Sequence, residues 1–289
     1  MNSYQKYLKY KKKYIELKNL IGGNNLEIMP QLCLGTSNWT NKDELKYVIK
    51  QAIKVGYRHF DGAIIYANQS LYKADSDEYY EGFKSGILEG LQETGISRED
   101  IWITFKSPSP DEIDVIKTKL SELKYIDLWL YHLTRNDNNK KVEPYLTSGF
   151  ILNWGTSNEY HLNDYSDEIL SKNLHTNQIQ ARPDSKTKTL IEYLNKLDIN
   201  VMLFSPISAI NEDTLIDIKY GKNPHILNSI IKYYLHEYVY DKKNVLMIGS
   251  ISGSSLEENF RLFTSKEVIS EEENVWLQDN YLTWELRDM

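Results

Sequence analysis

Eight short apolar segments recur along the chain, and helical segments separate most of them. The expected strands are residues 31–36, 57–61, 101–106, 126–132, 150–158, 176–181, 200–205 and 245–250. The stretches between them, such as 42–56, 76–95 and 110–124, repeat apolar residues with the 3.6-residue period of a helix. Strands that alternate with helices form a parallel sheet, and eight such units in one domain predict a closed (β/α)8 TIM barrel of the α/β class.

A doubly wound Rossmann sheet is the competing α/β fold. That fold carries a Gly-rich G-x-G-x-x-G turn after its first strand, whereas residues 34–39 read LGTSNW. We therefore expect the barrel, and we assign it to residues 26–289.

The first 25 residues differ in composition from the barrel and form a separate leader with its linker. Residues 1–21 hold six lysines against one glutamate, whereas the whole chain has a formal charge of −7. Tyrosine and aliphatic residues recur there at spacings of three and four, which predicts a short amphipathic helix that ends at Gly22 and Gly23. The leader resembles the Tyr/Lys-rich leaders of giant-virus proteins. We expect either a helix docked on the barrel or an address tag that binds an unknown partner.

Composition excludes several classes of function. The acidic body disfavours a nucleic-acid surface on the barrel, and no apolar run is long enough to span a membrane. The single cysteine, Cys33, excludes a disulfide framework and favours a reducing compartment. The six histidines show no metal-ligand spacing, so we expect no metal site. These features predict a cytoplasmic protein, or one in the host cytoplasm or virion if the leader is viral.

Polar residues gather where the predicted strands end. In (β/α)8 barrels the chemistry sits at the carboxyl ends of the strands. The polar residues at these ends are Asp61, Lys106, His132, Ser157, Asn158, Gln178, Ser205 and Ser250. Each alone has a structural explanation, but their recurrence on consecutive strands predicts a functional site.

From Met29 to its end, the chain resembles the aldo-keto reductases. The segment GYRHFDGAIIYANQ at 56–69 is similar to the family pattern H-x-D-x-A-x-x-Y. Further similar segments follow in the family's order: WITFK at 102–106, IDLWLYH at 126–132, GTSN at 155–158, NQIQARP at 177–183, FSP at 204–206 and LMIGSISGSSLEENFRLF at 246–263. The resemblance implies a reductase that converts an aldehyde or ketone to an alcohol.

The four catalytic residues implied by this resemblance also make chemical sense together. A carbonyl that accepts a hydride needs a proton donor, and Tyr66, with an ordinary pKa near 10, is a weak acid. We expect the Lys106 ammonium to bring the pKa of Tyr66 towards the working range and Asp61 to keep Lys106 charged. We expect His132 to orient the carbonyl oxygen through a hydrogen bond.

The resemblance also implies a nicotinamide dinucleotide as cofactor, with NADPH expected and NADH as the alternative. Ser157, Asn158 and Gln178 would hold its carboxamide, and Phe204 would stack on the nicotinamide ring. The remaining contacts implied by the resemblance are Ser205 and Ser250 on the phosphates, Asn259 on the adenine, and Gly35 and Thr36 beside the ring.

The chain departs from the family at the phosphate clamp and around the pocket. Gly249 and Ser255 stand where many members have a lysine and an arginine for the 2′-phosphate, which weakens the preference for NADPH. Only 24 residues separate His132 from Ser157, so at most a short fourth helix fits there. Residues 70–77 resemble an insertion near the mouth, and we expect the long C-terminal specificity loop to be missing.

Aromatic side chains that often line the family's pocket are also missing. Ser107, Pro108 and Leu133 stand in two of these places, which leaves Trp39 as the expected aromatic wall. Because several pocket elements are altered, the sequence does not name the substrate.

Three hypotheses for function follow. The first is an active NAD(P)H-dependent carbonyl reductase that acts as a monomer on a small carbonyl substrate. The second is a sensor or scaffold that binds the nucleotide with little turnover. The third is a virion-associated protein whose leader does the essential work. Fold alone does not choose between them.

Overall fold

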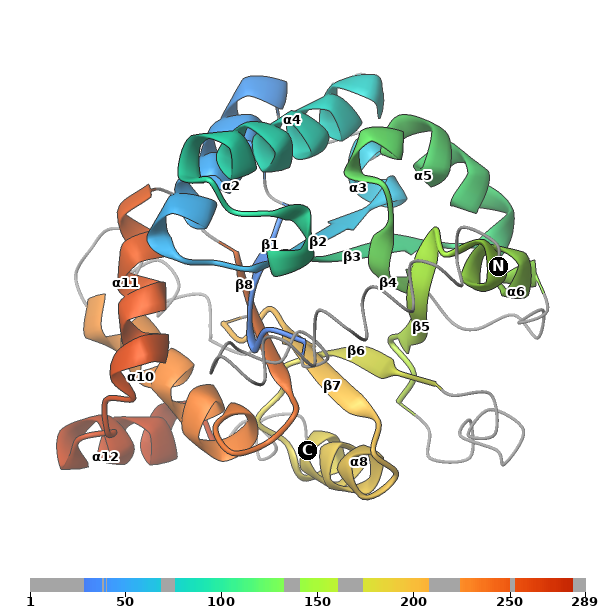
Figure 1. Ribbon diagram of the computed structural model, residues 1–289. Helices are drawn as coiled ribbons and strands as arrows, with labels where there is room; N and C mark the ends of the chain where they lie inside the picture. The colour runs from blue at the N-terminus through green and yellow to red at the C-terminus, as the bar shows by residue number, and fades with distance from the viewer. Residues whose placement is uncertain are drawn as a thin grey trace, which may run out of the picture.

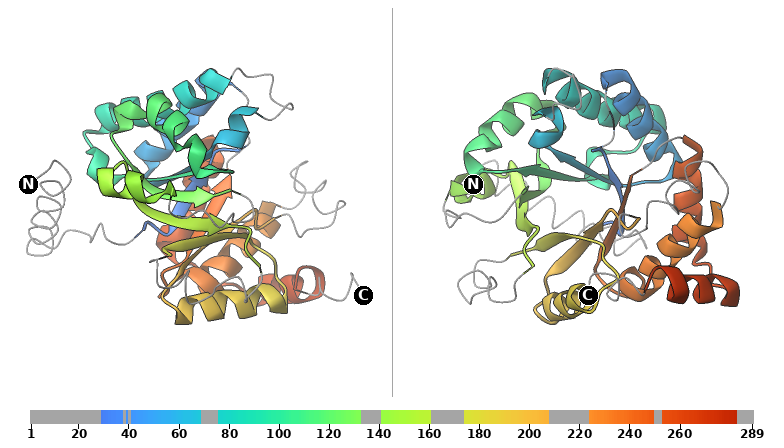
Figure 2. Two further views of the ribbon diagram at one scale, coloured as in Figure 1. Left: turned by 90° about the vertical axis from the view of Figure 1, so that its right-hand side faces the viewer. Right: turned by 180° about the vertical axis from the view of Figure 1, so that it is seen from behind.

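The computed structural model describes residues 29–37, 39, 41–68, 76–132, 141–160, 174–207, 224–249 and 253–282. Eight parallel strands close into a barrel in chain order, and helices surround it (Figures 1 and 2). The strands are β1 (Leu32–Gly35), β2 (His59–Ala63), β3 (Trp102–Ser107), β4 (Ile126–Tyr131), β5 (Ile151–Ser157), β6 (Thr176–Gln180), β7 (Asn200–Phe204) and β8 (Val245–Gly249). The predicted (β/α)8 barrel is confirmed, while the leader and Ser250 lie outside the described residues.

Longer helices alternate with the strands and cover their outer faces. They are α2 (Lys42–Val55), α3 (Ile64–Asn68), α4 (Ser76–Thr94), α5 (Ile113–Lys119), α6 (Glu143–Ser148), α8 (Ser185–Lys196), α10 (Pro224–Tyr234), α11 (Gly253–Ser265) and α12 (Glu271–Asn280). Short 3₁₀ turns η1 (Arg98–Asp100), η2 (Pro110–Glu112) and η3 (Ser121–Leu123) and the π-helical turn η6 (Leu235–Val239) complete the described elements. The six residues of α6 agree with the short fourth helix expected from the sequence.

Side-chain caps explain where several helices begin. The Asn41 carboxamide accepts the Glu44 N–H at 2.7 Å before α2, and the Asp184 carboxylate accepts the Thr187 N–H at 2.6 Å before α8. These bonds satisfy N–H groups that have no partner within the helix. Pro110, expected to open a helix, instead opens the 3₁₀ turn η2, and α5 begins three residues later at Ile113.

The barrel has an apolar interior that is separate from the core under the helices. The buried side chains of the interior cluster are Met29, Cys33, Trp102, Leu128, Leu130, Met202, Val245 and Met247. Gly155 on β5 lies where an added Cβ would be 2.2 Å from a main-chain oxygen of Thr176 on β6, so strand packing requires its missing side chain. Close packing of this interior fixes the positions of the strand ends.

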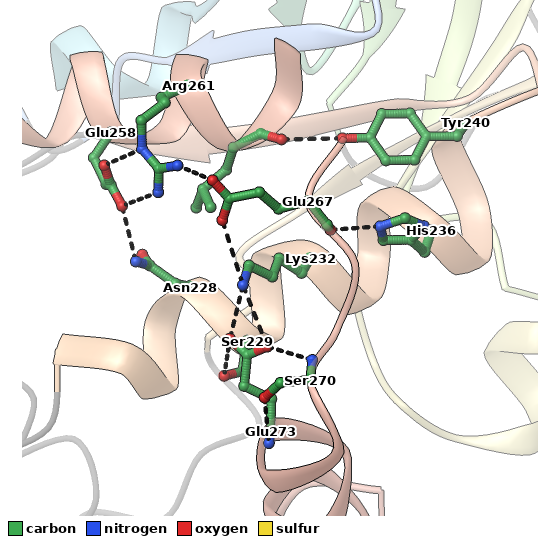
Figure 3. A network of polar contacts seen from close by, with 11 residues as sticks. Asn228, Ser229, Lys232, His236, Tyr240, Glu258, Arg261, Glu267, Ser270 and Glu273 are labelled. Carbon is green, nitrogen blue, oxygen red and sulfur yellow. Dashed lines mark hydrogen bonds and ion pairs between the residues drawn. The ribbon is translucent and has the colours of Figure 1, made fainter. Parts of the chain in front are cut away.

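Charged side chains join the last helices to one another. Figure 3 shows Lys232 on α10 bound to Glu273 on α12 at 2.9 Å and to Glu267 at 3.5 Å. Arg261 on α11 pairs with Glu258 at 2.8 Å and also with Glu267. One such surface pair stabilises a protein little, but a shared network restricts the movement of all its members. Helices α10, α11 and α12 are thereby joined at one side of the barrel.

Candidate active site

Asp61 lies at the centre of a buried polar cluster inside the barrel. It stands in the middle of β2, whereas the strand expected from the sequence, residues 57–61, ended at it. The Lys106 ammonium from β3 donates to its Oδ1, and the Gln178 amide from β6 donates to its Oδ2 at 2.8 Å. Asp61 and Lys106 have no exposed surface, so each charge depends on the other.

Two opposing effects act on the Asp61 carboxyl group. Burial raises its pKa, because a charge without water is unfavourable, while Lys106 and the Gln178 hydrogen bond oppose the rise. Its main-chain oxygen is also held, since the Thr36 hydroxyl donates to it at 2.7 Å. Asp61 is therefore fixed both at its side chain and at its backbone.

Tyr66 reaches this cluster because helix α3 follows β2 directly. The Lys106 ammonium lies 5.1 Å from the centre of the Tyr66 ring. The His132 ring from the end of β4 meets the same tyrosine edge to face, with ring centres 5.7 Å apart. The structure therefore brings Asp61, Tyr66, Lys106 and His132 together.

The pKa of Tyr66 moves in the direction opposite to the expectation from the sequence. Burial raises it well above its ordinary value, and the Asp61 charge and Cys33 add to the rise. The Lys106 ammonium, 5.1 Å from the ring centre, does not outweigh this rise. Tyr66 is therefore a protonated phenol at neutral pH, which is the form that a proton donor needs.

His132 is neutral at this site. Burial and the nearby Lys106 ammonium lower its pKa from 6.5 to about 3. Its Nδ1 is buried and has no hydrogen-bond partner among the residues that the structure describes. A neutral imidazole keeps one N–H, so it can donate to a carbonyl oxygen without adding a charge.

The residues expected to hold the carboxamide form one hydrogen-bonded group at the ends of β5 and β6. Asn158 adopts the left-handed backbone, with φ at 64°. Its side-chain Nδ2 donates to the Ser157 hydroxyl at 3.1 Å and to the His132 main-chain oxygen at 3.2 Å. Its own N–H donates to the Gln178 main-chain oxygen at 2.8 Å. Asn158 thus connects His132 after β4 to Gln178 on β6.

Tyr160, which the sequence did not single out, supports Asn158. Its hydroxyl accepts the Gln180 N–H at 3.0 Å and donates to Asn158 Oδ1 at 3.4 Å. The Arg182 guanidinium lies 5.7 Å from its ring centre. No sequence signal marked this tyrosine, because its role depends on a contact between β6 and the loop after β5.

Gly35 and Thr36 were expected to let the cofactor approach the backbone, but both are occupied by neighbours. A Cβ at Gly35 would lie 3.2 Å from the Met247 side chain, so Met247 fills that space. Thr36 is fully buried, and its hydroxyl lies 2.7 Å from the Tyr79 hydroxyl as well as bonding Asp61. Tyr79 also accepts the Ala63 N–H at 3.4 Å. Thr36 and Tyr79 hold β2 in place through these bonds.

Tyr79 is a second site residue that sequence reasoning missed. It lies on α4, fully packed against the site, with its ring centre 6.1 Å from that of Tyr66. Helical periodicity predicts a core position for it. That periodicity carries no signal of its bond to Thr36.

The remaining predicted cofactor residues lie at the ends of β7 and β8. Phe204 is half-buried at the end of β7 and packs against the interior cluster, and Ser205 beside it is exposed with φ at 52°. Asn259 on α11 is 4% exposed and hydrogen bonds with the Tyr57 hydroxyl. That bond directs its side chain to the protein rather than to a surface groove. Trp39, the expected pocket wall, packs partly buried against the core.

No group of His, Cys, Asp or Glu residues suited to a metal ion occurs in the described part of the chain. Likewise, none of the described helices combines the length and apolar character needed to cross a membrane.

The chain is similar to known proteins both in sequence and in fold. No protein-family model matches the chain. It is 31% identical over 223 residues to the uncharacterized oxidoreductase YtbE of Bacillus subtilis, covering 72% of this chain and 75% of that protein. It is 27% identical over 263 residues to the glyoxal reductase of Bacillus subtilis, covering 86% of this chain and 88% of that protein.

The fold is also similar to that of solved structures. An aldo/keto reductase from Brucella melitensis matches with a TM-score of 0.63 and 22% sequence identity, covering 89% of this chain and 96% of that chain. At this identity the match shows the fold alone. The match to YtbE, by contrast, is long and similar enough to show common membership of a family.

Proposed function

The chain belongs to the aldo-keto reductase family of nicotinamide-dependent oxidoreductases, and we propose that it reduces a small aldehyde or ketone with NADPH. The observation that carries the proposal is the convergence of Asp61, Tyr66, Lys106 and His132 at one end of the barrel. Stability alone does not explain why these residues lie together, because burying a lysine and an aspartate costs more folding free energy than burying an apolar pair would.

The residues present fit a nicotinamide ring with its carboxamide. The Gln178 Nε2 donates to Asp61, and its Oε1 accepts no hydrogen bond from the part of the chain that the structure describes. The Ser157 hydroxyl accepts from Asn158 and can donate its own proton. A planar amide would find both an acceptor and a donor here, and the half-buried Phe204 at the end of the next strand would supply the ring face.

When bound, the reduced cofactor supplies the hydride, and the protein supplies position and the proton. The neutral His132 donates its N–H to the carbonyl oxygen and orients it. The Tyr66 hydroxyl then gives its proton to the same oxygen as negative charge develops there. The ammonium of Lys106, held by Asp61, stabilises the phenolate left behind.

NADPH is the proposed cofactor, although the family's charged phosphate clamp is incomplete. Gly249 is exposed at the end of β8, and Ser255 lies in the first turn of α11. The N–H groups at a helix N-terminus attract a phosphate, and a serine hydroxyl adds a donor. A missing charged contact would weaken phosphate binding by ~1.5–3 kcal/mol. NADH is therefore the direct comparison in any titration.

The first test is replacement of Tyr66 by phenylalanine. We expect turnover of small aldehydes to fall by about 10² to 10⁴-fold, the usual contribution of a positioned proton donor. The dissociation constant for NADPH, measured by fluorescence titration, should stay unchanged. Tyr80→Phe is the matched control, since Tyr80 is a buried tyrosine that stacks on Phe105 without touching the cluster's charges. Full activity of the Tyr66→Phe variant would contradict the assignment.

The same measurements separate this function from the alternative of a nucleotide-binding sensor or scaffold. The altered positions Gly249 and Ser255 motivate that alternative. Tight cofactor binding with no turnover across a broad aldehyde panel would support it. A monomeric state and a partner for the leader are further expectations, which a sedimentation measurement and deletion of residues 1–25 would test.

A further inference from the structure

Ser205 has an unusual backbone conformation at the end of β7. Its φ of 52° lies in the left-handed region, where a side chain is unfavourable. It also precedes Pro206, and residues before proline prefer extended backbone. Such a conformation persists only when the surrounding structure holds it in place. The contacts on both sides of Ser205 are therefore informative.

Main-chain oxygens on either side of Ser205 are both held. The Ala181 N–H donates to the Phe204 oxygen at 2.8 Å, which fixes the end of β7 against β6. The Tyr281 hydroxyl donates to the Pro206 oxygen at 2.5 Å, from a residue 75 positions further along the chain. Ser205 lies between two fixed peptide groups, so its backbone cannot relax without breaking one of them.

Tyr281 is itself rigidly placed. It follows α12 directly and is fully buried. The Tyr234 hydroxyl on α10 lies 2.9 Å from the Tyr281 hydroxyl. Because the Tyr281 hydroxyl donates its hydrogen bond to the Pro206 oxygen, the Tyr234 hydroxyl is the donor in the bond between the two tyrosines. Two phenols in sequence thus lead from α10 to the loop after β7.

Aromatic and charged contacts hold the two helices that carry these phenols. The Tyr233 ring meets both the Tyr234 and the Tyr281 rings edge to face, at 5.2 and 6.3 Å between centres. The network in Figure 3 joins the same two helices through Lys232 and Glu273. The loop after β7 is therefore braced by the C-terminal part of the fold.

We propose that Tyr281 is a positioning residue for cofactor binding, acting through Pro206 on the left-handed Ser205 and on the ring of Phe204. The inference rests on the proposed function, in which Phe204 and Ser205 contact the cofactor. Without the Tyr281 hydroxyl, the Pro206 oxygen loses its donor and Ser205 is free to return to an extended backbone. That change would redirect the Ser205 side chain and N–H away from the cofactor.

The test compares two variants of the full chain that each remove one buried phenol hydroxyl. Tyr281→Phe removes the bond to Pro206. Tyr240→Phe is the matched control, because the Tyr240 hydroxyl also donates to main-chain oxygens, at Leu262 and Phe263 on α11 (Figure 3). For each, the dissociation constant for NADPH, its KM, kcat at saturating cofactor and the melting temperature are measured.

We expect Tyr281→Phe to raise the dissociation constant for NADPH about tenfold, because the variant loses one hydrogen bond that positions the site. The kcat at saturating cofactor should change less than twofold. Tyr240→Phe should lower the melting temperature similarly and leave the dissociation constant unchanged. Equal NADPH affinity in wild type and Tyr281→Phe would overturn the positioning role while the proposed function stands.

Two further outcomes are decisive. If wild type binds neither NADPH nor NADH, both the proposed function and the positioning role are overturned. If Tyr281→Phe does not fold, Tyr234→Phe decides, because it removes the phenol that holds the Tyr281 hydroxyl in place against the Pro206 oxygen. It should weaken NADPH binding about threefold. Unchanged binding in that variant would overturn the inference.

Discussion

Replacing Lys106 by methionine tests whether the buried ion pair is held for chemistry rather than for stability. The Lys106 side chain is 1% exposed and that of Asp61 is 0% exposed. Removing one partner of such a pair leaves an uncompensated buried charge, which costs about 3–5 kcal/mol. In a domain of this size, that lowers the melting temperature by about 6–20 °C.

The double variant Asp61→Asn with Lys106→Met should recover most of that stability. Methionine replaces the lysine stem, and the asparagine oxygen still accepts the Gln178 amide. A buried pair replaced by uncharged groups of similar size is often neutral for stability. The double variant should nevertheless have no turnover, because neither charge is present beside Tyr66.

The stability deficit of the single variant should also depend on pH. Burial raises the pKa of Asp61, and Lys106 opposes that rise, so removing Lys106 raises the pKa further. When the pKa of a carboxyl group is higher in the folded than in the unfolded state, the free energy of unfolding falls as pH rises towards the folded-state pKa. The deficit of Lys106→Met is therefore smallest at low pH. It grows as pH rises through the wild-type pKa and becomes constant above the variant's pKa.

Urea unfolding followed by tryptophan fluorescence, at pH 5 and pH 8, measures these differences. Lys50→Met is the control, because Lys50 pairs with Glu89 and Glu93 on the surface at 2.9 and 2.6 Å. Such exposed pairs contribute about 1 kcal/mol or less. A double variant as unstable as Lys106→Met alone would refute the reasoning.

Three other predictions follow from the buried groups. Burial lowers the pKa of His59 from 6.5 to about 3, so the free energy of unfolding falls as pH drops below 6.5. Between pH 7 and pH 5, wild type should lose about 2 kcal/mol more of this free energy than His59→Gln does, as measured by urea unfolding. Gly155→Ala would place a Cβ 2.2 Å from an oxygen of the next strand and should lower the melting temperature by more than 10 °C, whereas Gly95→Ala, in open space with φ at 70°, should cost only about 1 kcal/mol. Gln178→Met removes a hydrogen-bond donor that lowers the pKa of Asp61, so the acid limb of the pH–kcat profile should move to higher pH. If the acid limb does not move, Lys106 alone opposes the rise in the pKa of Asp61.

The fold could be predicted because its signals are local. Each strand is a short run of buried residues, and each helix repeats its apolar residues with one period, so the eight units are visible without tertiary information. The caps at Asn41 and Asp184 are likewise set by neighbours three residues away. Strand boundaries depend on sheet pairing as well, and β2 runs two residues beyond Asp61, where the expected strand ended.

The candidate site was only partly predictable. A motif located Asp61, Tyr66, Lys106 and His132, but the direction of the Tyr66 pKa depends on burial, which no motif records. The contact between Gln178 and Asp61 joins strands on different parts of the barrel, so it follows from closure of the sheet.

The supporting residues were missed for a related reason. Tyr79 and Tyr281 have the spacing of ordinary core residues, and their roles rest on single hydroxyl groups. The bond between Asn259 and Tyr57 was missed as well, because it depends on how α11 packs.

The bond between Asp61 and Gln178 also sets an order of events during synthesis. The two residues are separated by 117 positions, which a ribosome adding about 5–20 residues per second completes in about 6–23 s. Lys106 reaches Asp61 earlier, since only 45 positions separate them. The second oxygen of Asp61 therefore gains its partner only after the sixth strand has been made. The nascent chain lacks the complete hydrogen-bonded cluster around Asp61 until more than half of the barrel has been translated.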